Sequence, residues 1–276
     1  NEAVTLSTSV ASSSFSEDIS TGTTISTASA TDPENATISY TLSGTGSDKF
    51  SVSSDGTVTL SSALDYESTT SYSLTLTASD GTNSTSESIA FNVGNVNEAV
   101  SLSTSVAANS FLEDISTGTT IATASATDPE NATISYTLSG TGSDKFSVSS
   151  DGTVTLSSGL DYESTTSYSL TLTASDGTNS TSESIAFNVG NVNEAVSLST
   201  TLAASSFAEN ISTGTTIATA SATDPENATI SYTLSGTGSD KFSVSSDGTV
   251  TLSSGLDYES TTSYSLTLTA SDGTYS

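Results

Sequence analysis

The segment Tyr72–Ala78, YSLTLTA, alternates apolar and polar residues at every position. Successive side chains of a β-strand point to opposite faces of the sheet, so strict alternation predicts a strand with one buried face and one wet face. Tyr72, Leu74, Leu76 and Ala78 would face a core, and the Ser and Thr residues between them would face water.

The same alternation continues on both sides of this segment. Apolar residues alternate with Ser and Thr in Ile38–Leu42, Val58–Leu60 and Ile89–Val93. Asp55-Gly56 lies between two such runs and is typical of a hairpin turn. About seven short strands in a unit of this length indicate an all-β fold, an antiparallel β-sandwich. The other all-β architecture, a barrel, has no particular support.

The chain consists of three copies of one unit. Residues 1–96 and 97–192 differ at six positions, and the third copy, residues 193–276, differs from the second at six positions. We therefore expect three tandem sandwiches with these boundaries. The third copy stops before the counterpart of Ile89–Val93, so we expect a fragment of a longer array. Alternatively, a strand from a neighbouring molecule would complete this sandwich.

The composition excludes several classes of protein. The chain has 31 acidic residues, three basic residues and a net charge of -28, which disfavours nucleic acids and anionic membranes as partners. It has no Cys and no His, the residues that supply the preferred ligands of zinc, copper and iron. The remaining ligands are oxygens, which suit calcium or magnesium. No apolar run spans a bilayer, so any export signal or anchor is expected outside this segment.

Each complete copy carries its acidic residues in short motifs of fixed order. In the first copy these are Glu17 in FSEDI, Asp32 and Glu34 in ATDPEN, Asp65 and Glu67 in LDYE, and Asp80 in ASDG. The heptapeptide GNVNEAV follows at Gly94–Val100 and recurs at Gly190–Val196. This order resembles the cadherin repeats, which carry a glutamate after strand A, then A-x-D-x-D, L-D-R-E, A-x-D-G and the junction motif D-x-N-D-N. The resemblance covers the whole array.

The resemblance implies Greek-key, immunoglobulin-like sandwiches whose junctions chelate calcium. The first junction would use oxygens of Glu17, Asp65, Glu67, Asn95, Asn97, Glu98, Asp128, Glu130 and Asp176. The second junction would use Glu113, Asp161, Glu163, Asn191, Asn193, Glu194, Asp224, Glu226 and Asp272. GNVNEAV is then the linker that binds metal between two sandwiches.

The motifs depart from the family pattern at several positions. Asn95 and Ala99 replace the first Asp and the last Asn of the linker, Glu130 replaces the second Asp of A-x-D-x-D, and Tyr66 replaces the Arg of L-D-R-E. Asn95 removes one charge from the linker, so two to three ions per junction are expected. Tyr66 is interpreted as a surface or linker-packing aromatic residue, with sugar stacking as the alternative.

The charges of the junction support the same interpretation on physical grounds. Seven of the nine predicted ligands of the first junction are carboxylates, and like charges in one small volume repel each other. Without divalent ions these groups would separate the two sandwiches or raise their own pKa values. Calcium accepts six to eight oxygens in flexible geometry and would bridge the two sandwiches.

These observations favour a calcium-rigidified extracellular stalk or filament, similar to the cadherin-like arrays of bacterial surface adhesins and biofilm proteins. The alternatives are lateral homotypic assembly and a polysaccharide-binding module. An enzyme that uses Asp65 and Glu67 as an acid and base pair is disfavoured, because the same pair recurs in every copy. The expected partners are calcium, neighbouring repeats and other copies of the chain, outside the cell or at its surface.

Overall fold

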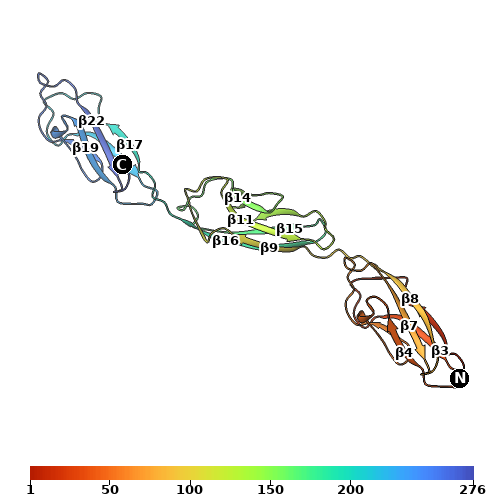
Figure 1. The fold of residues 1–276 in the computed structure, drawn as a ribbon. Coiled ribbons are helices and arrows are strands. Elements are labelled where there is room, and N and C mark those ends of the chain that lie inside the picture. Colours follow the sequence, from red (N-terminus) through yellow and green to blue (C-terminus); the bar gives the residue numbers. More distant parts are fainter.

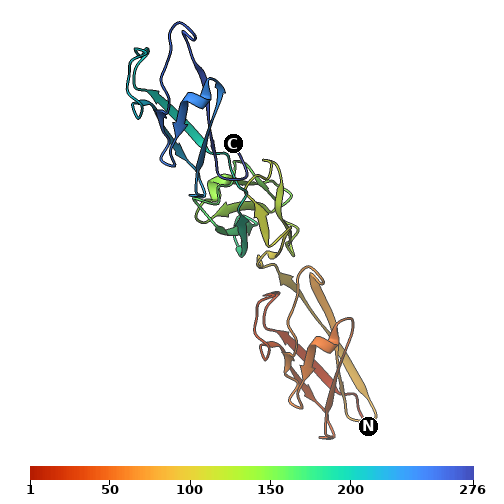
Figure 2. The same cartoon turned by 90° about the vertical axis from the view of Figure 1, so that its left-hand side faces the viewer.

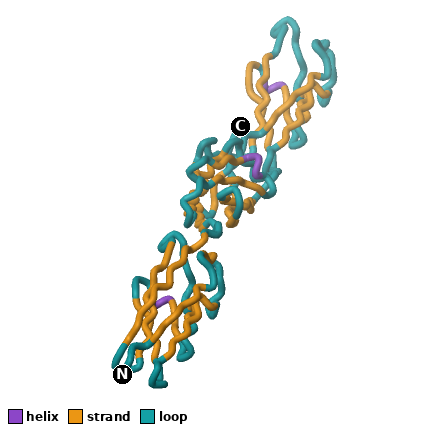
Figure 3. Tube along the Cα trace, turned by 90° about the vertical axis from the view of Figure 1, so that its right-hand side faces the viewer, coloured by secondary structure: helices purple, strands orange, loops and turns teal.

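The computed structural model describes residues 1–276 as three β-sandwiches arranged end to end in an elongated row (Figures 1 and 2). We call them repeats 1, 2 and 3. The N-terminus lies at the outer end of repeat 1, and the C-terminus lies at the end of repeat 3 that faces repeat 2. The helical content is limited to short 3-10 turns within strands and loops (Figure 3). No helix is long and apolar enough to cross a membrane.

Repeat 1 packs two four-stranded sheets against each other. One has the order β1-β3-β6-β5 and the other the order β2-β8-β7-β4. Every pairing is antiparallel except that of β2 with β8, which is parallel. The elements are β1 (Thr5–Val10), β2 (Ser14–Ser16), β3 (Thr24–Thr31), β4 (Ser39–Ser43), η1 (Ser47–Lys49), β5 (Phe50–Val52), β6 (Val58–Leu60), β7 (Ser71–Ser79) and β8 (Ser84–Gly94).

Repeat 2 has the same two sheets, and repeat 3 retains one of them in full. The elements of repeat 2 are β9 (Ser101–Val106), β10 (Ser110–Leu112), β11 (Thr120–Thr127), β12 (Ser135–Ser139), η2 (Ser143–Lys145), β13 (Phe146–Val148), β14 (Thr153–Leu156), β15 (Ser167–Ser175) and β16 (Ser180–Gly190). Those of repeat 3 are β17 (Ser197–Leu202), β18 (Thr216–Thr223), β19 (Ser231–Thr237), η3 (Ser239–Lys241), β20 (Phe242–Val244), β21 (Thr249–Leu252) and β22 (Ser265–Ser271).

The predicted alternation produces the core. Along β7, Tyr72, Leu74, Leu76 and Ala78 are buried, as the sequence indicates. They pack with the buried face of β8, where Phe91 lies 5.5 Å from the Tyr72 ring in a stacked geometry. Each fully buried Leu side chain contributes about 1.5–3 kcal/mol. The Ser and Thr residues between them are the wet face of the sheet, which confirms an all-β sandwich.

The predicted hairpin at Asp55-Gly56 connects β5 to β6, which pair antiparallel. Gly56 has a φ of 82°, and Asp55 Oδ1 accepts the N–H of Thr57 at 3.0 Å. A Cβ on Gly56 would lie 3.0 Å from the carbonyl oxygen of Ala28. Both the positive φ and the close neighbour therefore require glycine at this turn.

The longest strand of the sandwich also joins the two sheets. Glu87 on β8 accepts hydrogen bonds from the N–H and Oγ1 of Thr8 on β1, at 3.0 and 2.7 Å. Repeat 3 has only β19 and β22 in its second sheet. Leu202 on β17 is accordingly 67% exposed, whereas its counterpart Val106 packs partly buried against the core of repeat 2.

The parallel pairing of β2 with the end of β8 determines where the sequence motifs meet. Ser16 pairs with Gly94, so the residue after β2 lies beside the linker that leaves β8. The LDYE loop, between β6 and β7, reaches the same end of the sandwich. The ATDPEN and ASDG loops leave the opposite end, and in repeat 2 this end faces repeat 1.

The core predicts a large stability difference between two leucine substitutions. Leu74→Ala removes a fully buried side chain and is expected to destabilise repeat 1 by about 2–5 kcal/mol. Leu112→Ala removes a side chain that is 52% exposed and should change stability by less than about 0.5 kcal/mol. Hydrogen exchange of the β7 amides measures the stability of repeat 1, and exchange of the β15 amides measures that of repeat 2. Equal effects of the two changes would contradict this packing.

Candidate metal centre

Glu17 is the buried anchor of the first junction. It follows β2 and is 6% exposed. Its Oε2 accepts the N–H of Tyr66 in the LDYE loop, and its Oε1 accepts the N–H of Val96 in the linker, both at 2.6 Å. One carboxylate therefore fixes the LDYE loop and the linker relative to each other.

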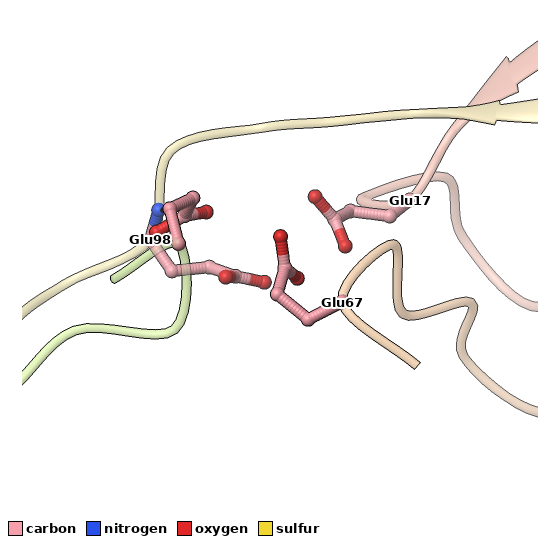
Figure 4. Close-up of side chains that lie close together, drawn as sticks. Glu17, Glu67 and Glu98 are labelled. Carbon is pink, nitrogen blue, oxygen red and sulfur yellow. Dashed lines mark hydrogen bonds between the residues drawn. The ribbon is translucent and has the colours of Figure 1, made fainter. Parts of the chain in front are cut away.

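Four glutamates from two repeats and the linker converge at this junction. Each of Glu17, Glu67, Glu98 and Glu130 offers one carboxylate oxygen, and these four oxygens all lie within 4.8 Å of one another. Figure 4 shows the carboxylate of Glu67 between those of Glu17 and Glu98. We call this set the junction glutamates. Repeat 1 supplies two of them, the linker supplies Glu98, and repeat 2 supplies Glu130.

The ATDPEN loop of repeat 2 holds Glu130 against the linker. The N–H of Asn131 donates to the carbonyl of Asp128 at 3.1 Å, and Asn131 has a φ of 56°. This turn points Glu130 toward the linker, where its Oε1 accepts the N–H of Glu98 at 3.3 Å. Asp128 is 8% exposed, and its Oδ1 accepts the N–H of Ala132 at 2.8 Å.

Three other predicted ligands lie outside the junction glutamates because local hydrogen bonds hold them. Asp65 accepts the N–H and Oγ of Ser68, at 2.8 and 2.9 Å. Asp128 is held within its own loop, as described above. Asp176 Oδ1 accepts the N–H groups of Thr178 and Asn179 at 2.6 Å each. The structure thus gathers four of the seven carboxylates that the sequence places at this junction.

The asparagines of the linker have separate positions. Asn97 donates its Nδ2 to Asp176 Oδ2 at 2.6 Å and to the carbonyl of Glu98 at 3.1 Å. Asn95 lies on an open pocket beside Glu67 and Glu130. Sequence reasoning missed Asn179, whose Nδ2 donates to the carbonyls of Asn97 and Glu98 at 2.9 Å each. Its position after ASDG was the only signal that could have identified it.

The second junction repeats this geometry. Glu113, Glu163, Glu194 and Glu226 form the equivalent group within 4.8 Å. Glu113 accepts the N–H groups of Tyr162 and Val192. Among the other predicted residues, Asp161 accepts a hydrogen bond from the N–H of Ser164, and Asn193 donates one to Asp272. Asn191 lines an open pocket, and Asp224 is 8% exposed. At the far end of repeat 3, Glu209, Asp257 and Glu259 form an exposed group of three.

The crowding changes the acidity of the junction carboxyls. Desolvation, the hydrogen bond with Glu130 and repulsion by the other junction glutamates raise the pKa of Glu98 to about 7. The same causes raise the pKa of Glu194 to about 7. Desolvation, then the charges of Glu17 and Glu130, raise the pKa of Glu67. The amide of Asn97 lowers the pKa of Asp176. Desolvation and closely spaced negative charge therefore both disfavour the ionised carboxylates at each junction.

The residues present fit a hard divalent cation. Asp128 Oδ2, Glu98 Oε2 and Glu130 Oε2 are buried without a hydrogen-bond partner, as are their counterparts on Asp224, Glu194 and Glu226. Buried carboxylate oxygens are normally paired with a donor or a cation. The donors are all oxygens, the ligand type that calcium accepts in groups of six to eight.

The comparison with protein families identifies the class of the chain. The cadherin domain model matches residues 11–93, 108–189 and 204–276. These matches cover most of each repeat, so the chain belongs to the cadherin family. Cadherin domains are extracellular adhesion modules that bind calcium and pack against neighbouring repeats. The resemblance seen in the sequence motifs is confirmed. No curated protein matches the chain.

Solved cadherin structures have the same arrangement of tandem repeats. Mouse cadherin-23 EC22-24 is 26% identical with a TM-score of 0.59, and the alignment covers 99% of this chain and 94% of that one. A protocadherin gammaB7 EC3-6 cis-dimer structure is 27% identical with a TM-score of 0.58 over 93% of this chain. The structure of protocadherin gamma B2 extracellular domains 1-5 is 25% identical with a TM-score of 0.62, and the alignment covers 95% of this chain. This chain spans 66% and 56% of the two protocadherin chains.

The raised pKa of Glu98 predicts how the metal-free junction responds to pH. Because the closed junction holds a proton more tightly than an ordinary Glu of pKa 4.5, its stability in chelator is greatest below about pH 4.5 and is lost as the pH rises through about 7. Carboxyl NMR of Glu98 should give an apparent pKa near 7 in chelator. Asp55, whose pKa is lowered by Ser53, is the internal control. A Glu98 midpoint near 4.5 would contradict the observed crowding.

The amide of Asn179 predicts a difference between the two junctions. Tyr275 occupies the corresponding position in repeat 3 and donates no bond to the second linker. Asn179→Tyr should therefore speed amide exchange around Asn97 by the loss of about 1–2 kcal/mol. Tyr275→Asn is the reciprocal variant and should slow exchange around Asn193. If neither variant changes its own linker, the two hydrogen bonds contribute nothing to linker stability.

Proposed function

We propose that calcium ions at the junctions rigidify this chain into an extracellular rod, the stalk or filament-forming part of a bacterial-type surface adhesin or biofilm protein. The observation that carries the proposal is the convergence of the junction glutamates from repeat 1, the linker and repeat 2 within 4.8 Å. Such a group is unfavourable alone and becomes favourable when a cation is shared among its members.

Two kinds of residue would hold the ions at the first junction. The junction glutamates would supply most of the charge, and the unpartnered Oδ2 of Asp128 would supply a buried oxygen. Asp65, Asn95, Asn97 and Asp176 complete the proposed set, with the equivalent residues at the second junction. Asp65 and Asp176 would exchange local hydrogen bonds for metal contacts. We propose two to three calcium ions per junction.

The mechanism of stiffening follows from the origin of the ligands. Without cations, repulsion among carboxylates of both repeats favours splaying at the linker. A shared cation reverses the sign of this interaction and cross-links both repeats to the linker between them. A stiff array extends in proportion to the number of repeats, whereas flexible linkers coil and gain reach only as the square root of length. A rod would hold a distal binding module away from the cell.

Lateral association between copies of the chain is a second candidate function. One of the similar structures is described as a cis-dimer of a protocadherin, and the wet sheet faces here are mostly Ser and Thr. Analytical ultracentrifugation of the chain in calcium would show a concentration-dependent dimer. If the chain is a monomer at all concentrations, lateral association is excluded and only the function of a passive stalk remains.

The repeat boundaries 1–96, 97–192 and 193–276 are part of the proposal.

Calcium removal is the direct test of the rod. We expect chelator to broaden the distance distribution in small-angle scattering and to accelerate proteolysis near Asn97 and Asn193, because the cross-link at each junction is lost. Glu130→Gln should weaken calcium binding at the first junction by at least about tenfold. Calorimetry of the 276-residue chain measures this affinity.

The matched control for Glu130 is Glu34, its counterpart in repeat 1. Glu34 accepts the N–H of Glu2 at 3.1 Å, as Glu130 accepts that of Glu98, but in this chain it faces no glutamates from another repeat. Glu34→Gln should therefore leave the affinity of both junctions unchanged. A shape, digestion pattern and melting temperature that are identical with and without chelator would refute the rod.

A further inference from the structure

Each junction carries an open pocket beside the junction glutamates. The first has a volume of about 300 Å³ and the second about 350 Å³, and the same residue types line both. The walls of the first pocket include Tyr66, Glu67 and Asn95 from repeat 1 and its linker, and Pro129, Glu130 and Asn131 from repeat 2. The pocket exists only where two repeats meet.

The chemistry of the walls selects a polar, uncharged ligand. Pockets for small molecules have volumes of about 300–1,000 Å³ and are usually lined by apolar side chains. Here the walls are amides, carboxylates and a hydroxyl, with one aromatic ring and one proline ring. Asn amides both donate and accept hydrogen bonds, and carboxylates accept them, which matches the hydroxyl groups of a sugar. The lining has no Lys or Arg, so anionic ligands such as phosphates are disfavoured.

Two of the wall residues also belong to the junction glutamates. Glu67 and Glu130 line the pocket and lie within the close carboxylate group, and Figure 4 shows Glu67 facing both Glu17 and Glu98. An ion held there would lie at the edge of the pocket. Calcium often retains waters among its six to eight ligands, and two neighbouring hydroxyl groups of a sugar can replace such waters.

Tyr66 supplies a fixed apolar surface next to these polar groups. Its ring packs partly buried against the core of repeat 1, and its N–H is held by Glu17 at 2.6 Å. The flat face of such a ring suits the C–H face of a sugar. Tyr258, the counterpart in repeat 3, is 64% exposed and has no following repeat in this chain. A complete pocket therefore requires the next repeat.

We propose that each junction pocket binds a neutral saccharide unit of a polysaccharide, with its vicinal hydroxyls on junction calcium and its ring on Tyr66 or Tyr162. This inference rests on the proposed calcium junction and adds a ligand to it. One weak pocket per junction, repeated along a rigid array, gives avidity for a polymer that presents the same unit many times.

The test is retardation of the 276-residue chain in gels that contain dextran, mannan, galactan or xylan, in calcium and in chelator. We expect at least one of these polymers to retard the chain, and only in calcium. The double variant Tyr66→Leu/Tyr162→Leu keeps apolar volume against the core but removes the flat rings. It should lower the affinity for that polymer by about tenfold. Terbium binding, measured in parallel by calorimetry because the double variant removes the rings that would sensitise terbium luminescence, should be unchanged.

Tyr258→Leu is the matched control, because its pocket lacks the second wall, and it should leave retardation unchanged. Retardation by none of the polymers while terbium binds would overturn the saccharide pocket and leave the calcium junction intact. Retardation that survives chelator, or an equal loss in Tyr258→Leu, would also overturn it. Failure of terbium to bind would overturn both proposals.

Discussion

The mutual repulsion of carboxylates at the repeat junctions governs how this chain behaves as a whole. Four glutamates from separate segments meet within 4.8 Å, and no Lys or Arg of the chain pairs with them. Each sandwich has its own hydrophobic core away from these carboxylates. The repulsion acts between the two repeats and the linker that supply the carboxylates. Under the calcium binding proposed above, this local charge imbalance would control the overall shape, and the concentration of divalent cation would set the stiffness.

The fold makes this possible through one short strand. β2 leaves the sheet of β1 and β3 and pairs in parallel with the last residues of β8. Glu17 follows directly and reaches both the LDYE loop and the linker through its two oxygens. Junction residues that are 81 positions apart in sequence, Glu17 and Glu98, therefore become neighbours without any insertion or long loop. The opposite end of the sandwich presents the ATDPEN loop, so repeat 2 contributes to both junctions, one at each end.

The sequence was sufficient for the fold because alternation is a local property: YSLTLTA and the Asp55-Gly56 turn each determine their own geometry. The family was also accessible, since the order of the acidic motifs follows the cadherin pattern. The hydrogen-bond donors that compete with a metal for each carboxylate could not be predicted from the sequence. Asp65 is bonded to Ser68 and Asp176 to its own turn, interactions that depend on atomic positions rather than on motif order. The role of Asn179 and the pocket beside Tyr66 arise between repeats, where spacing along one repeat carries no information.

The turn at residues 80–83 bears on how near-identical sandwiches fold in one chain. β8 and β16 have identical sequences, so either strand fits the edge of β7 or of β15 with the same register and the same side chains. Only connectivity distinguishes the correct partner from its duplicate one repeat away. Closing a loop of about 100 residues instead of four disfavours the exchanged pairing by on the order of 3 kcal/mol. Asp80 stiffens the short connection by accepting the N–H groups of Thr82 and Asn83 at 2.6 Å each. The tight hairpin thereby protects the array from strand swapping between adjacent units during synthesis and refolding.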